Sequence, residues 1–155
     1  MENKRRVAIP ITAVIFGAVV GVALIWMDYF SDYSNVLKIN WELSLPHDAA
    51  YSEVYSQSSE STFNGDGTRY HVFTYVNTTP ISEMLAWQST ERKTLYSGSY
   101  SAAVEDWLDK LGVPANERPV YENCSYWYQS QADNSEIIIL WGERENKLYV
   151  VESFL

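Results

Sequence analysis

The sequence predicts an α+β protein in which one transmembrane helix precedes a two-layer domain. Three observations lead to this fold class. Residues 7–27 contain no charged side chain, as a membrane-spanning helix requires. Several later stretches alternate apolar and polar residues with a period of two, which is typical of half-buried strands. Between these stretches lie two segments with helix start signals or apolar residues at helical spacing.

Residues 7–27 have the length and the flanks of a membrane anchor. Their 21 residues would form a helix of about 31 Å, which matches the hydrocarbon core of a bilayer. The bulky segment Leu24–Phe30 does not resemble a signal-peptide cleavage site, so we expect the helix to be retained. Basic residues at 4–6 precede it and acidic residues at 28 and 32 follow it, which places the N-terminus in the cytoplasm. The expected organisation is a cytoplasmic tail (1–6), a transmembrane helix (7–27), a juxtamembrane connector (28–35) and an extracytoplasmic α+β domain (36–155).

Small residues recur at every fourth position of this segment, at Ala13, Gly17 and Gly21. This spacing lets two helix backbones approach closely, so a homodimer through the transmembrane helix is one interpretation. The other, and more common, is that Gly and Ala are simply frequent in membrane helices. The sequence leaves both open.

The chain beyond the predicted anchor is strongly acidic. Residues 28–155 retain eight of the 11 Lys and Arg and 19 of the 20 Asp and Glu, a formal charge of −11. Nucleic-acid binding requires Lys and Arg against phosphate, so we expect no nucleic-acid partner. A cationic partner or a need for solubility would each account for the charge.

Cys124 is the single cysteine of the chain, so an intramolecular disulfide is excluded. Stability must therefore come from the core. The position of Cys124 in a predicted strand indicates a buried apolar residue rather than a reactive thiol. An extracytoplasmic domain without disulfides favours a bacterial source.

Three strands are expected before the helices. Val36–Leu45 alternates, with apolar residues at every odd position from 37 to 45, and ends at Pro46. Glu53–Thr62 and Arg69–Val76 flank Asn64-Gly65-Asp66-Gly67. Asn, Asp and Gly suit the positive φ angles of a tight turn, so these two segments predict a β-hairpin.

Two helices and three more strands follow. The first helix begins at Thr79-Pro80, because Pro fits the first helical turn. The second has apolar residues at i, i+3, i+4 and i+7 within Val104–Leu111, and Gly112 ends it. The nearly continuous apolar run Ile137–Trp141 predicts a central strand buried on both faces. The last strands are Val120–Gln129, Glu136–Gly142 and Lys147–Phe154, which gives the order βββααβββ and an antiparallel sheet with two helices packed on one face.

The sequence contains no motif with recognisable chemistry. The two histidines, His47 and His71, lack the spacing of metal ligands, and no GxSxG motif marks a nucleophile. Asn64–Gly67 offers oxygen ligands, yet the calcium-loop spacing is absent and a turn explains these residues. We therefore assign no catalytic residue and expect no metal site and no cofactor. A triad assembled from distant positions stays open.

Aromatic residues make up 15% of the chain, and we expect them to exceed what one core can hold. Tyr121, Tyr126, Trp127 and Tyr128 lie in one predicted strand, where neighbouring side chains point to opposite faces. At least one ring must then face away from the helices, and exposed Tyr and Trp favour contact with proteins or sugars. These four residues are the candidate partner-binding residues. An aromatic sheet face without a ligand is the alternative.

The segment Phe63-Asn64-Gly65-Asp66-Gly67, the alternating strand after it and the N-terminal anchor together carry a resemblance. The chain resembles small single-pass envelope proteins of low-GC Gram-positive bacteria, in which a Phe-x-Gly-Asp-Gly turn often precedes a similar strand. Asn64 stands where those proteins commonly have His. That group has no assigned activity, so the resemblance implies a location and no mechanism.

The function favoured by these patterns is that of a membrane-anchored binding domain without enzymatic activity, whose partner outside the cytoplasm is a protein or an envelope polymer. An anchored hydrolase acting on peptide, ester or glycan is an alternative. An immunity-type protein whose acidic surface blocks a cationic partner is another.

Overall fold

The computed structural model describes residues 32–46, 51–60, 66–88, 93–94 and 98–155, and divides the chain into two compact units, Met1–Leu45 and Pro46–Leu155. The predicted transmembrane helix, with Ala13, Gly17 and Gly21, lies outside the described residues, as do the cytoplasmic tail, residues 28–31 of the connector, His47 and the Asn64-Gly65 part of the predicted turn. Within the described ranges, no helix is long and apolar enough to cross a membrane.

The first unit contains a helix where the sequence predicts a strand. Helix α2 spans Tyr33–Trp41, so the prediction of a strand over Val36–Leu45 is wrong. Asp32 caps the helix, because its side chain accepts a backbone N–H of the first turn at 3.0 Å. Glu42 ends the helix with a left-handed φ of 59°, and its N–H reaches two carbonyls of the last turn.

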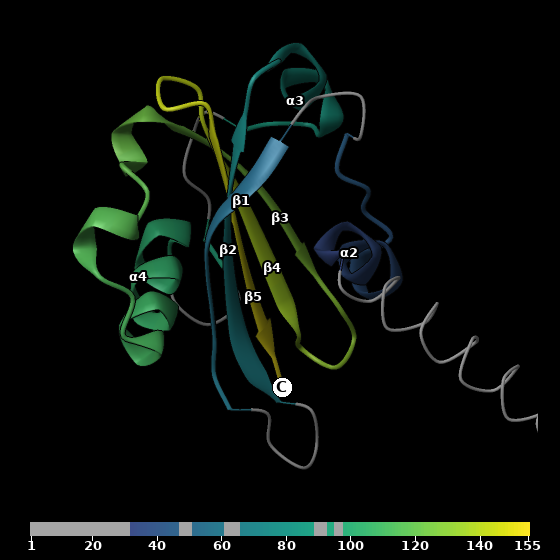
Figure 1. Cartoon of the computed structure of the whole chain (residues 1–155). Coiled ribbons are helices and arrows are strands. Elements are labelled where there is room, and N and C mark those ends of the chain that lie inside the picture. The colour runs from purple at the N-terminus through teal and green to yellow at the C-terminus, as the bar shows by residue number, and fades with distance from the viewer. Residues whose placement is uncertain (1–31, 47–50, 61–65, 89–92, 95–97) are drawn as a thin grey trace, which may run out of the picture. The chain divides into compact units, whose positions relative to one another are not determined.

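The second unit is built on an antiparallel sheet of five strands in the order β1-β2-β5-β4-β3 (Figure 1). The strands are β1 (Tyr51–Ser58), β2 (Gly67–Tyr75), β3 (Cys124–Ser130), β4 (Glu136–Gly142) and β5 (Lys147–Phe154). The α+β class and the antiparallel sheet are confirmed. The prediction of six strands is wrong, because the first of them is α2.

Strand pairing confirms two further predictions. β1 and β2 pair antiparallel from Tyr51↔Tyr75 to Ser58↔Arg69, as the predicted hairpin requires. β4 lies between β5 and β3, and every residue from Glu136 to Gly142 is buried. Since neighbouring side chains on a strand point to opposite faces, both faces of β4 are buried.

Helix α4 (Tyr100–Leu111) packs on one face of the sheet (Figure 1). Its start is capped by Ser99, whose Oγ accepts the Ala102 N–H at 3.2 Å, and its end is Gly112 with a φ of 67°. The predicted apolar stripe of α4 is buried against the sheet. The core between them consists of Tyr70, Val72, Tyr100, Ala103, Val104, Trp107, Leu108, Leu111, Val113, Cys124, Tyr126, Ile138, Leu140, Tyr149 and Val151.

The expectation that two helices pack on one sheet face holds for α4 alone. Helix α3 (Thr79–Met84) forms where predicted, with Pro in its first turn, but it lies beyond the end of β2 (Figure 1). Two short 3-10 helices, η1 (Ala115–Glu117) and η2 (Tyr121–Asn123), connect α4 to β3. The second of these occupies the first residues of the predicted strand Val120–Gln129.

Candidate functional site: the Arg118 network

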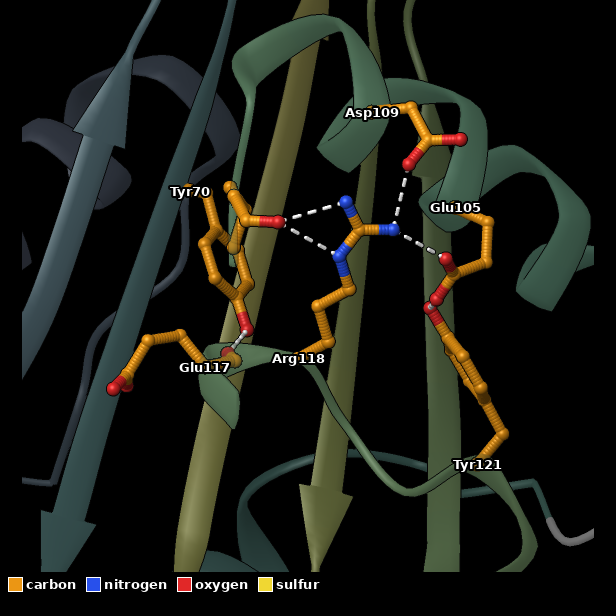
Figure 2. A network of polar contacts seen from close by, with 7 residues as sticks. Tyr70, Glu105, Asp109, Glu117, Arg118 and Tyr121 are labelled. Atoms are coloured by element: carbon orange, nitrogen blue, oxygen red, sulfur yellow. Dashed lines mark hydrogen bonds and ion pairs between the residues drawn. The ribbon is translucent and has the colours of Figure 1, made fainter. Parts of the chain in front are cut away.

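The segment after α4 folds back onto the helix and delivers Arg118 to its C-terminal end. Gly112 ends α4, and the chain then turns through Pro114 and η1. Arg118 Nε and Nη2 donate to the Val113 carbonyl at 2.9 and 2.7 Å. Nη1 lies 2.6 Å from Glu105 Oε2 and 2.7 Å from Asp109 Oδ1 (Figure 2). Arg118 therefore ties the connecting segment to two turns of the helix.

Electrostatics favour this position of the guanidinium. The C-terminal end of a helix carries partial negative charge, which a cation complements. The pKa of Arg118 is raised, chiefly by its hydrogen bond with Asp109 and also by Glu105. Only 19% of the Arg118 side chain is exposed, against 40% for Glu105 and 70% for Asp109. The cation is thus covered, while the carboxylates keep a side open to solvent.

Two tyrosines extend the network on either side of Arg118 (Figure 2). The Tyr121 hydroxyl donates to Glu105 Oε1 at 2.5 Å, so both oxygens of this carboxylate are engaged. The Tyr70 hydroxyl donates to the Glu117 carbonyl at 2.5 Å and fixes η1 over the sheet. Burial raises the pKa of both tyrosines well above 10, and Glu105 raises that of Tyr121 further. Both hydroxyls therefore stay protonated and act as donors.

The contacts of Arg118 determine which charge a ligand of this network could carry. All three guanidinium nitrogens of Arg118 already hold acceptors, which leaves no open fork for a bound anion. The network instead immobilises carboxylates on the outer side of α4. Glu105, Asp106 and Asp109 form what we call the α4 acidic surface, in which Asp106 is 54% exposed and pairs with Lys110 at 2.6 Å. Three carboxylates stand here against two cations, Arg118 and Lys110, so the surface keeps a net negative charge, and Arg118 fixes two of the carboxylates. Such a surface is suited to a cationic partner.

The four predicted partner-binding aromatics, which lie in η2 and β3, fall into two groups. Tyr126 is buried in the core, and Tyr128 lies with its ring centroid 5.0 Å from that of Tyr100. The Tyr128 hydroxyl donates to Glu136 Oε1 at 2.5 Å, and burial with this bond raises the pKa of Tyr128 to about 12. Tyr121 belongs to the Arg118 network. These tyrosines thus serve the α4 side of the sheet.

Trp127 is the residue of that set that faces the other way. It alternates with Tyr126 and Tyr128, so its ring lies on the sheet face away from α4, as the alternation predicts. It is half-buried, and its strand β3 is an edge of the sheet. The outer edge of β3 is itself partly paired, because Gln88 and Tyr126 exchange backbone hydrogen bonds of 2.8 and 2.9 Å.

His71 contacts Glu53 across the β1–β2 hairpin, with 2.6 Å between Nδ1 and Oε1. Burial lowers the pKa of His71, although Glu53 and Glu152 oppose the shift and Arg69 adds to it. The distance between Nδ1 and Oε1 is short enough for an ion pair, which would require a protonated ring. Because the pKa is lowered from 6.5, the ring is neutral at pH 7 and the contact is a hydrogen bond.

The other features considered for chemistry are the Cys124 thiol and clusters of metal-ligating side chains. The Cys124 thiol is buried, donates to the Val120 carbonyl at 3.4 Å, and has its pKa raised to about 12 by burial. Among the residues that the structure describes, no group of three His, Cys, Asp or Glu side chains could hold a metal ion.

Comparison of the chain with protein-family models, with curated proteins and with solved structures finds no match. The assignment of a function therefore depends on the geometry described above.

Sequence reasoning missed Arg118 as the centre of the site. The spacing of the apolar residues in Val104–Leu111 leaves Glu105 and Asp109 on the outer side of the helix, where they lie, but it indicates no partner for them. Arg118 lies 13 residues from Glu105, and their contact depends on how the segment after Gly112 folds back. The helix-ending Gly112 and the prolines that follow are the signals that such a return was coming.

Proposed function

We propose that this chain is a single-pass membrane protein whose C-terminal domain binds a cationic protein or envelope polymer outside the cytoplasm. The observation that carries the proposal is the α4 acidic surface, in which Arg118 holds Glu105 and Asp109, Tyr121 also holds Glu105, and Asp106 pairs with the exposed Lys110. Preorganised charges lose little freedom on binding and steer an oppositely charged partner. The net charge of −11 over residues 28–155 adds a long-range attraction of the same sign.

The membrane anchor of this proposal is the uncharged segment of residues 7–27, with basic residues before it and acidic residues after it. Protease added to intact cells should remove the C-terminal domain and leave the cytoplasmic tail protected. Complete protection of the domain would overturn the topology.

Site-specific photo-crosslinking tests the binding surface in the full chain. A photoreactive residue at Ala102 would stand on the exposed side of α4 without removing a carboxylate, and one at Ser58 on β1 serves as the control. We expect Ala102 to yield a discrete adduct in intact cells that weakens in Asp106→Asn and at raised salt. The matched control Glu143→Gln removes an exposed charge from another part of the domain and should leave the adduct unchanged.

Two results would contradict the proposal. One is an adduct at Ala102 that is indifferent to salt and to Asp106→Asn. The other is the same adduct in equal yield from Ser58, since that would report proximity in the membrane rather than binding through α4.

A further inference from the structure

Helix α2 has an apolar residue on the side where a surface helix is normally polar. Leu37 and Trp41 are buried, and at 100° per residue they define one side of the helix. Ile39 lies nearly opposite that side and is 55% exposed. Val36, three residues before it, is half-buried and extends the same row.

Helix α2 itself carries a single charged side chain, that of Lys38. Lys38 is exposed beside Ile39, and it is the basic residue of the last turn. The acidic residues Asp32 and Glu42 cap the two ends of the helix. The outer side of α2 thus presents the exposed Ile39 and the half-buried Val36, with the polar Asn35 one turn before Ile39 and Lys38 at the margin, a mixture of apolar and polar side chains that suits a membrane interface.

The short connection between the proposed anchor and α2 limits how far the helix can lie from the membrane. The proposed span ends at Met27 and α2 begins at Tyr33. Six consecutive Cα–Cα steps reach at most roughly 20 Å, in whatever conformation residues 28–32 adopt. The headgroup region of a bilayer adds roughly 5–8 Å beyond the hydrocarbon core. The start of α2 is therefore held within reach of the membrane surface.

We propose that the outer side of α2, formed by Val36, Lys38 and Ile39, lies in the headgroup layer of the membrane that holds the anchor. Ile39 and Val36 enter the boundary with the acyl chains, and Lys38 reaches anionic headgroups. This inference rests on the membrane anchor of the proposed function. It adds that helix α2, which follows the anchor, contacts the membrane surface.

Lipid quenching in the full chain tests the contact. The variant Ile39→Cys carries an environment-sensitive fluorophore, and Ser58→Cys on the exposed, polar strand β1 is the control. The chain without an added cysteine should take up almost no label, because Cys124 is buried. Both variants are reconstituted in vesicles of phosphatidylcholine and phosphatidylglycerol that contain lipids spin-labelled near the headgroup.

We expect the label at Ile39 to be quenched several-fold more than the label at Ser58. Raising the phosphatidylglycerol content should strengthen quenching at Ile39, and Lys38→Gln should remove this dependence. Equal quenching at the two sites, in protein that stays with the vesicles after alkaline carbonate, would overturn the contact and leave the anchor intact. Release of the protein by carbonate would overturn the anchor and the contact together.

Discussion

Arg118 Nη1 lies 2.6 Å from Glu105 Oε2, which joins the segment after α4 to the middle of the helix. The two residues are 13 positions apart, so the bond fixes the path of the chain between Gly112 and β3. The same guanidinium covers the Val113 carbonyl just past the helix end. One side chain thus caps α4 and positions the carboxylates that we propose to bind a partner.

Replacement of Arg118 by Ala should destabilise the domain by about 1–3 kcal/mol. The substitution leaves the part-buried Val113 carbonyl without its donors and places Glu105 and Asp109 together without a cation. Urea unfolding of the full chain in detergent, followed by tryptophan fluorescence, measures the change. The control is Lys110→Ala, which breaks the exposed pair with Asp106 and should cost no more than about 0.5 kcal/mol. Equal effects of the two substitutions would contradict a structural role for the network.

The buried tyrosines should resist ionisation in alkali. Burial raises the pKa of Tyr70, Tyr75, Tyr121 and Tyr149 well above 10. A raised pKa in the folded state means that the stabilisation is complete below pH 10 and is lost as pH rises above it, because the unfolded chain then loses protons first. Phenolate absorbance should therefore show fewer ionised tyrosines at about pH 11 in the folded chain than in urea. Ionisation of all 12 tyrosines near pH 10 before unfolding would contradict the burial.

Much of the sheet could be predicted because local chemistry and long-range packing agree there. The run Ile137–Trp141 is apolar at every position, and an interior strand is the place where both faces are buried. In α4, the stripe ending at Leu111 and the positive φ required at Gly112 point to the same helix.

Helix α2 was mispredicted as a strand because an alternating pattern and a helical pattern overlap in the same short segment. Apolar residues at 37, 39, 41, 43 and 45 alternate as in a strand. Tyr33, Leu37 and Trp41 are also spaced four apart, and these three are the apolar residues that α2 buries. The deciding signal was Asp32, a strong N-cap residue placed just before the helix. The Arg118 network was beyond prediction, because its contacts depend on the tertiary path of an irregular segment.

Acid should destabilise the domain partly through His71. Its pKa is lowered from 6.5, first by burial, against the opposing effects of Glu53 and Glu152 and together with Arg69. A lowered pKa in the folded state gives stabilisation that is present above 6.5 and is lost as pH falls, at up to about 1.4 kcal/mol per pH unit.

The variant His71→Gln isolates this contribution, since Gln can still donate to Glu53 but does not titrate. Free energies of unfolding measured between about pH 7 and pH 5 should fall more steeply for the wild-type chain than for His71→Gln. Parallel pH profiles for the two chains would show that His71 has the same pKa in both states.

Cys124 should behave as a core residue rather than as a reactive thiol. Its side chain is packed between the sheet and the segment after α4, it donates to the Val120 carbonyl, and burial raises its pKa to about 12. Because the thiolate is the nucleophile, alkylation by iodoacetamide at about pH 8 should be slow in the folded chain and fast in urea. Cys124→Ala should lower stability modestly and leave the photo-crosslink at Ala102 unchanged. Rapid alkylation without denaturant would instead place the thiol at the surface, and would contradict the burial of Cys124 at the start of β3.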